Sequence, residues 1–178
     1  MSFIPRARNT IHVVTTGGTI DKTYDEKGGS LVNKYSVAIN RLKNYLRLPY
    51  TKIIEHNILA KDSLEITNAE RAKIVSYINN LYFDNEFPIV VIHGTDTLSV
   101  VSYQVYENFK GQAKKPVIFT GAMRPVGLVD SDAIQNLTEA LLLAKTVDPG
   151  VYVSFHGHVF LGNKVKKNTT KGTFEDVS

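Results

Sequence analysis

Short apolar runs that are rich in β-branched residues alternate along the chain with longer segments of helical period. Five of these runs predict strands: Ile11–Thr15, Lys52–Leu59, Pro88–Ile92, Pro116–Thr120 and Val151–Phe155. Apolar strands separated by helices are typical of a parallel sheet that is buried on both faces. The pattern therefore predicts an α/β domain with a doubly wound, mostly parallel sheet and helices on both faces, as in flavodoxin-like and Rossmann folds.

Four segments between these runs predict helices: Ser36–Leu48, Thr67 to about Tyr82, about Thr97–Phe109 and about Ser131–Thr146. The first segment carries its apolar residues on one helical stripe. The second begins with Thr67 and Glu70, which have the spacing of a capping box. Both features favour helices at these places.

The composition favours one globular domain that spans residues 1–178. A chain of 178 residues with 43% apolar residues is long enough for one buried core and too short for two large domains. The absence of cysteine excludes disulfides and thiolate zinc sites and fits a reducing compartment. The segment "MSFIPRARNT" contains no long apolar run, so no secretory signal or membrane span is expected. We therefore expect a soluble, cytoplasmic protein with no membrane partner.

The positive charge of the chain does not predict a nucleic-acid partner. The formal net charge is +4, but the basic residues are scattered, apart from the segment "NKVKKNTTK" near the C-terminus. We interpret this segment as a solvated tail, because a nucleic-acid site needs basic residues gathered on one face.

Polar residues follow four of the five predicted strands. The first strand is followed by "TTGGTI", the second by Lys61-Asp62-Ser63, the third by "HGTDT" (residues 93–97) and the fourth by "GAMRP" (residues 121–125). In doubly wound folds the ligand binds outside the carboxyl ends of the strands. We therefore expect these hydroxyls and carboxylates to converge at one edge of the sheet.

The segment "TTGGTI" does not fit a phosphate-binding loop. It lacks both the G-x-G-x-x-G spacing and the lysine of a Walker motif, and the residues after it predict a loop or hairpin rather than a helix. The glycines either form a purely structural turn or permit a tight turn that exposes Thr16 to a small ligand.

The segment "HGTDT" also allows two interpretations. Its hydroxyls and carboxylate can cap the helix that follows. Alternatively, Asp96 binds a ligand's ammonium group and Thr95 presents a hydroxyl. His93, His156 and His158 have no carboxylate cluster near them in the sequence, so no metal is expected. A serine hydrolase is not favoured, because no G-x-S-x-G elbow is present.

Three of these segments together resemble a known family. "TTGGTID", "HGTDT" and "TGAMRP" are similar, in this order, to three signatures of the bacterial-type L-asparaginases, and the resemblance covers nearly the whole chain. That family has two α/β domains, of which this chain resembles the larger, N-terminal one. We therefore expect a short-chain L-asparaginase without the family's C-terminal domain, although a cut fragment is the alternative.

The resemblance implies hydrolysis of the side-chain amide of L-asparagine to L-aspartate and ammonia, without a metal or cofactor. Thr16 matches the nucleophilic threonine and Tyr24 the tyrosine that assists it. Thr95 and Asp96 match the second signature, and Lys167 matches the catalytic lysine, with Lys166 as its rival. The resemblance implies further substrate contacts at three positions, Asp62, Ser63 and Ala122, where Ser63 binds the α-carboxylate.

The same resemblance implies a lid and an oligomer. The loop from about residue 17 to 30 is expected to close over the substrate, with Gly28 and Gly29 as its hinge. Asp25, Glu26 or another subunit would replace an acidic group of the missing domain, with weaker substrate binding as the result. A homodimer or homotetramer is expected. Two rival functions remain open at this point: a glutaminase–asparaginase of broader specificity, and a non-catalytic amino-acid sensor.

Overall fold

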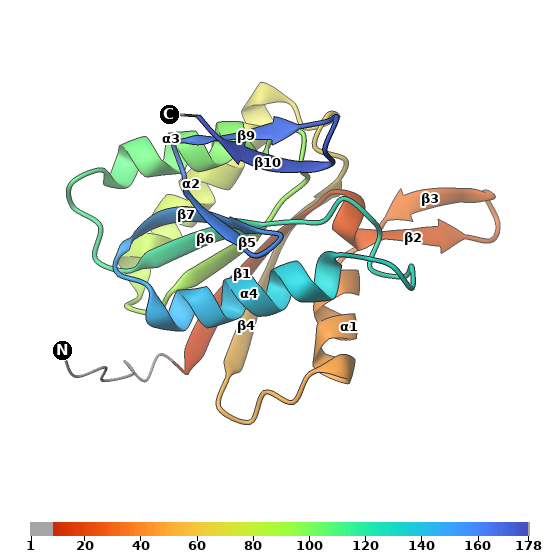
Figure 1. Cartoon of the computed structure of the whole chain (residues 1–178), viewed down its shortest axis with the longest axis horizontal. Coiled ribbons are helices and arrows are strands. Elements are labelled where there is room, and N and C mark those ends of the chain that lie inside the picture. Colours follow the sequence, from red (N-terminus) through yellow and green to blue (C-terminus); the bar gives the residue numbers. More distant parts are fainter. Residues whose placement is uncertain (1–8, 178) are drawn as a thin grey trace.

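The structure, a computed structural model, describes residues 9–177. A six-stranded sheet in the order β4-β1-β5-β6-β7-β8 lies at its centre (Figure 1). Its strands are β1 (Thr10–Gly17), β4 (Lys52–Lys61), β5 (Ile89–Ile92), β6 (Pro116–Thr120), β7 (Gly150–Phe155) and β8 (His158–Leu161). The first five are parallel, which confirms the five predicted strands, and β8 pairs antiparallel with β7.

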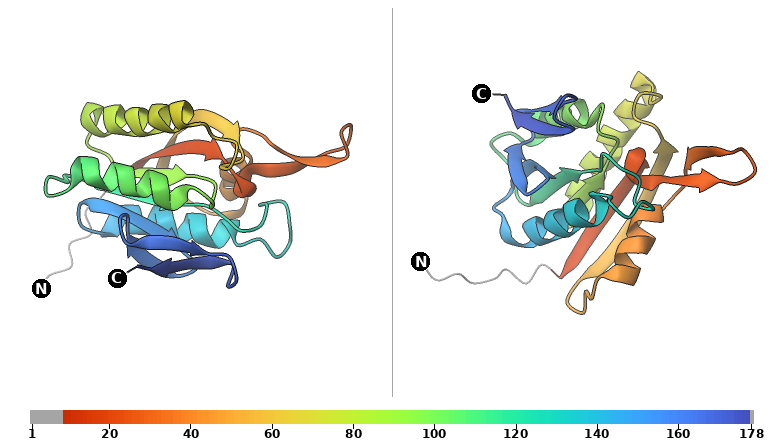
Figure 2. Two further views of the ribbon diagram at one scale, coloured as in Figure 1. Left: turned by 90° about the horizontal axis from the view of Figure 1, so that it is seen from above. Right: turned by 45° about the vertical axis from the view of Figure 1, so that its right-hand side comes forward.

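Two helices cover each face of the sheet (Figures 1 and 2). α2 (Asn68–Asp84) and α3 (Leu98–Phe109) contribute to one apolar cluster, and α1 (Val37–Tyr45) and α4 (Ala133–Thr146) to the other. Successive strand residues divide between the clusters: Val91 faces α2 and α3, whereas Val90 and Ile92 face α1 and α4. The predicted doubly wound α/β fold is confirmed.

The strand order also identifies the topological switch point of the sheet. The chain passes from β1 to its neighbour β4 on one side and then crosses to β5 on the other side of β1. Counted along the chain, the five parallel strands have the order 2-1-3-4-5 of flavodoxin-like folds, whose ligands bind where this reversal occurs. The segments after β1 and β5, residues 18–19 and 93–96, therefore meet at the switch point.

A short hairpin projects from the body of the domain directly after β1 (Figure 1). A single turn of 3₁₀ helix, η1 (Thr19–Asp21), leads into β2 (Lys22–Asp25), which pairs with β3 (Ser30–Asn33). Gly28 and Gly29 lie at the tip of this hairpin, where Gly29 has φ +64° and donates its N–H to the Asp25 carbonyl at 2.8 Å. The expected glycine hinge is therefore wrong, because these glycines close the turn.

A second hairpin pairs β9 (Val165–Asn168), which lies within the segment that we interpreted as a solvated tail, with β10 (Thr173–Asp176), which follows that segment. That interpretation is wrong. Val165 and Phe174 are 6% and 4% exposed and belong to the apolar cluster that contains α3. The polar and charged residues on either side of them hid this pattern, since each of these strands buries only one apolar side chain.

Residues 1–8, where the sequence predicts no signal segment, lie outside the described residues. Within residues 9–177, no helix is long and apolar enough to cross a membrane.

Candidate active site

The ends of three strands are in direct contact at the switch point. A Cβ on Gly18, after β1, would lie 2.4 Å from the Gly94 Cα, after β5. A Cβ on Gly94 would in turn lie 2.5 Å from the Cβ of Ser63, after β4. No side chain fits at such distances, so the glycines of "TTGGTI" and "HGTDT" allow the strand ends to meet.

Lys167 reaches this edge from the C-terminal hairpin. Its Nζ donates to the Thr95 Oγ1 at 2.8 Å and to the Asp96 Oδ1 at 2.7 Å. Lys166 points the other way and pairs with Glu175 at 3.1 Å, because neighbouring strand residues face opposite sides. The sequence left two candidates for the catalytic lysine, Lys166 and Lys167, and the structure places Lys167 beside Thr95. Its catalytic role stays a prediction.

The Thr16 side chain is fully enclosed by the protein. Its hydroxyl lies 2.6 Å from the His93 Nδ1 and 3.1 Å from the Ile92 carbonyl, and the residue is 0% exposed. The His93 Nε2 lies 3.1 Å from the Thr97 Oγ1, so the imidazole bridges two hydroxyls. Burial, together with the positive charge of Arg71, lowers the pKa of His93 to about 4, which keeps the ring neutral near pH 7.

Burial places Thr16 out of reach of a ligand that arrives from solvent. Thr19, the threonine that follows the two glycines of "TTGGT", is partly exposed and comes directly after Gly18, which packs on Gly94. The sequence analysis missed Thr19. A signal for it was present, since Thr16 continues the buried strand whereas the residue after both glycines leaves the sheet.

Two residues after β4 face the same edge. The Ser63 Oγ is buried and has no hydrogen-bond partner among the described residues, so it has an unused donor and acceptor. The Asp62 carboxylate is already engaged by Lys22 Nζ at 2.6 Å and by the Leu64 N–H at 3.1 Å. Burial alone would raise the pKa of Asp62, but these hydrogen bonds and the charges of Lys22 and Lys167 outweigh it and lower that pKa.

Tyr24 and Ala122 occupy contrasting positions. Tyr24 lies on the projecting hairpin, is 61% exposed and makes no hydrogen bond to Thr16, Thr95 or Lys167 within the described part of the chain. Its predicted role therefore requires the hairpin to move toward the sheet. Ala122 is the second residue after β6 and is 1% exposed, so only its backbone is available to a ligand.

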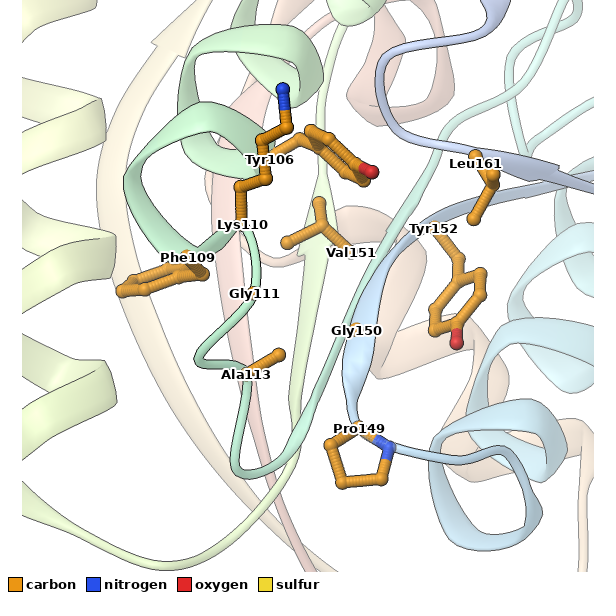
Figure 3. Close-up of a pocket in the computed structure, with 10 residues that line it drawn as sticks. All are labelled: Tyr106, Phe109, Lys110, Gly111, Ala113, Pro149, Gly150, Val151, Tyr152 and Leu161. Carbon is orange, nitrogen blue, oxygen red and sulfur yellow. The ribbon is translucent and has the colours of Figure 1, made fainter.

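A separate cleft of about 300 Å³ lies at the opposite end of the sheet (Figure 3). Tyr106, Val151 and Tyr152 line it beside Pro149 and Gly150, at the amino end of β7. It is far along the strands from their carboxyl ends and does not belong to the candidate site. In residues 9–177, no group of three or more His, Cys, Asp or Glu side chains could hold a metal ion.

Comparisons with known proteins show the family to which the chain is similar. The family model "Asparaginase, N-terminal" matches residues 10–176. The chain is 34% identical over 160 residues to an L-asparaginase of Thermococcus kodakarensis, covering 87% of this chain and 46% of that protein. It is 28% identical over 184 residues to a component of the glutamyl-tRNA(Gln) amidotransferase of Methanobrevibacter smithii, covering 97% of this chain and 41% of that protein.

The solved structure of the thermostable L-asparaginase from Thermococcus kodakarensis superposes with a TM-score of 0.82 at 31% identity, covering 94% of this chain and 51% of that one. The chain thus spans about half the length of these relatives. The matched family model, the signature glycines at the strand ends and the Lys167–Thr95 pair together assign the chain to the asparaginase family, as a member of its N-terminal domain type.

Proposed function

We propose that this chain hydrolyses the side-chain amide of L-asparagine to L-aspartate and ammonia. The observation that carries the proposal is the contact between the Lys167 Nζ and the Thr95 Oγ1 at 2.8 Å, beside the strand-end glycines. A lysine and a hydroxyl at hydrogen-bond distance can exchange a proton during a reaction. Thr95 is 3% exposed, so its hydroxyl is largely protected from water.

The nucleophile is the second point of the proposal. We assign it to Thr19 rather than to Thr16, because Thr19 is accessible and Thr16 is enclosed. The hydroxyl oxygen attacks the amide carbon, the carbon–nitrogen bond breaks, and the nitrogen leaves as ammonia after it takes up a proton. Water then hydrolyses the acyl-enzyme ester to aspartate and the free threonine. Thr16 has a supporting role, since it holds the His93 ring beneath the loop.

The two charged ends of the substrate have partners at the same edge. The unpartnered Ser63 Oγ is suited to the α-carboxylate and the Asp96 carboxylate to the ammonium group, as the resemblance implies. In this proposal, the backbone near Ala122 faces the side-chain amide of the substrate. Asp62 supports the site through Lys22 at the root of the hairpin, where it helps to hold Tyr24 ready for closure.

A broader amide specificity is the second candidate. The chain is similar both to L-asparaginases and to part of an amidotransferase, and one methylene group changes binding by only about 1–3 kcal/mol. A homodimer or homotetramer, a cytoplasmic location and a substitute for the acidic group of the second domain all stay predictions.

The test measures ammonia release from L-asparagine, from L-glutamine and without substrate. Thr19→Val is expected to lower kcat by about a thousandfold or more, because valine keeps the volume but removes the nucleophile. Thr16→Val is expected to lower kcat by about tenfold, because it removes the buried hydroxyl that contacts His93 and the Ile92 carbonyl. Thr170→Val, in the exposed turn between β9 and β10, is the matched control and should retain wild-type rates.

The opposite ranking of the two threonine variants would return the nucleophile to Thr16. A folded wild-type chain that releases no ammonia from either amide would reject hydrolysis. Calorimetric binding of aspartate to that inactive chain would then support the sensor function instead.

A further inference from the structure

The turn between β7 and β8 has an unusual residue at its first position. His156 and Gly157 form a two-residue hairpin loop with φ +50° and +76°. Positive φ at both positions is the type I′ geometry, which strongly favours Asn, Asp or Gly at the first one. Histidine tolerates this region better than most residues, but it is not the preferred choice. Something other than the turn itself explains a histidine at position 156.

The imidazole of His156 bridges two separate segments. Its Nε2 lies 2.8 Å from the Asp132 Oδ2, and its Nδ1 lies 2.9 Å from the Thr173 Oγ1. The backbone of the turn is held as well, because the His156 N–H donates to the Asn136 Oδ1 at 3.0 Å and the Gly157 N–H to Glu139 at 2.8 Å. The ring is therefore fixed in position with both of its nitrogens in use.

One end of this bridge holds the segment after β6. Besides His156, the Asp132 carboxylate accepts the N–H groups of Met123 at 2.9 Å and Arg124 at 3.0 Å. Asn136 donates to the same carboxylate at 3.0 Å and to the Gly121 carbonyl at 2.9 Å. The backbone on both sides of Ala122 is thus tied to the start of α4.

The other end of the bridge holds the hairpin that carries Lys167. Thr173 is the first residue of β10 and is paired with Asn168, and the next pair along the ladder is Phe174 with Lys167. The Thr173 hydroxyl is therefore one ladder position away from the lysine that contacts Thr95. A side chain on the β7–β8 turn joins two segments of the proposed site that are far apart in the sequence.

We propose that His156 is a positioning residue that sets the placement of the Lys167 hairpin relative to the segment around Ala122. This proposal rests on the proposed function, since it assumes that Lys167 takes part in the reaction. His156 touches no reacting group, and its effect passes through Thr173 to β9 and through Asp132 to residues 121–124. The bridge uses two nitrogens at once, which a shorter asparagine or aspartate in the same turn cannot do.

His156→Asn is the informative variant, because asparagine suits the turn and leaves the fold intact while the bridge is lost. Thr173→Val removes the hydroxyl and keeps a β-branched strand residue. Each variant is expected to lower kcat about tenfold with KM nearly unchanged, and the double variant to be no worse than either single one, because both break the same link. His158→Asn, an exposed histidine two residues on, is the control and should retain wild-type rates.

Hydrogen exchange provides a readout besides activity. The amides of β9 and β10 are expected to exchange several-fold faster in His156→Asn and Thr173→Val than in wild type or His158→Asn, because these strands lose a tether. Unchanged kcat, additive losses in the double variant, or unchanged exchange of the hairpin would each overturn the proposal. If the wild-type chain hydrolyses no amide, the proposed function fails, and faster exchange in the two variants would still establish the tether.

Discussion

The two hairpins outside the central sheet both carry residues predicted for the same site, yet they are held very differently. On β9–β10, Val165 and Phe174 are buried in the main apolar cluster and Lys167 makes two hydrogen bonds at the site. On β2–β3, Tyr24 and Leu31 lie opposite each other and are 61% and 52% exposed. The packed hairpin holds a charge in place at the candidate site, whereas the closure of the projecting hairpin over a substrate stays a prediction.

Three contacts at the root of the projecting hairpin hold it against the body of the domain. Lys22 pairs with Asp62, the Lys34 N–H donates to the Asp21 carbonyl, and the Val126 N–H donates to the Ile20 carbonyl. All of these contacts lie at one end of β2–β3, so the strands beyond them have few tertiary partners. Such an element opens at a low free-energy cost, as lids do.

Within the two hairpins, the largest effect is expected at Lys167. Lys167→Met keeps much of the apolar stem that packs on the hairpin but removes the group at Thr95, and kcat is expected to fall by about 10² to 10⁴. Lys166→Met is the matched control, because its ammonium group faces Glu175 on the other side of β9, and its rate should stay within about twofold of wild type. Steady-state ammonia release measures both. Equal losses in the two variants would show that the lysines act through overall charge and not through position.

Truncation of the packed hairpin should cost much more stability than truncation of the projecting one. Phe174→Ala is expected to lower the free energy of unfolding by about 3 kcal/mol, since it removes a buried ring from the main cluster. Leu31→Ala is expected to change it by less than about 0.5 kcal/mol, because that side chain is exposed. Urea denaturation followed by circular dichroism distinguishes the two. Similar losses would mean that the projecting hairpin packs on the body in solution.

Acid should change the contributions of two buried groups, His93 and Asp21, to the free energy of unfolding with opposite sign. Folding lowers the pKa of His93 from 6.5 to about 4. Between these two pH values the unfolded chain therefore binds a proton at His93 that the folded chain does not bind. The stability from neutral His93 is complete above pH 6.5 and is lost as the pH falls toward 4. Asp21, in the 3₁₀ turn before β2, opposes this. Burial raises its pKa from 3.8 to about 6, so its contribution is lost as the pH rises through that window.

Asp21→Asn is therefore expected to steepen the loss of stability between pH 6 and 4 by an amount on the order of 1 kcal/mol. Urea denaturation at several pH values measures the slope for wild type and variant. NMR titration of the His93 ring is the companion measurement, and the ring should stay neutral down to about pH 5. A flatter profile in the Asp21 variant, or a His93 ring that titrates near 6.5, would contradict this assignment.

Only a small effect on stability is expected at the root of the projecting hairpin. Lys22→Met breaks the pair with Asp62, which is partly exposed, and should cost no more than about 1 kcal/mol. Hydrogen exchange within β2 and β3 should nevertheless become faster, because a tether of the hairpin is lost. Lys27→Met, at the exposed tip, is the control and should leave exchange unchanged. Protection that is equal in both variants would show that the pair does not hold the hairpin.

Much of the fold could be predicted because the apolar periodicity of a long segment indicates which of its residues are buried. The five parallel strands and four helices were found, since an apolar strand or an amphipathic helix repeats its signal over many residues. The strands β8, β9 and β10 were missed because each has only four residues and buries few apolar side chains. The bridge through His156 was also missed, since hydrogen bonds across 17 and 24 residues leave no periodic signal.

For the candidate site, the sequence by itself determined at which strand ends the polar residues of the site gather. The glycines of "TTGGTI" and "HGTDT" and the polar residues after each strand located the edge, because parallel strands bring their carboxyl ends together. Only the tertiary structure decided which hydroxyl is accessible, which of two adjacent lysines reaches Thr95, and that the basic C-terminal segment is a packed hairpin. These outcomes depend on which side of a strand faces the core, and a single residue of register reverses that side.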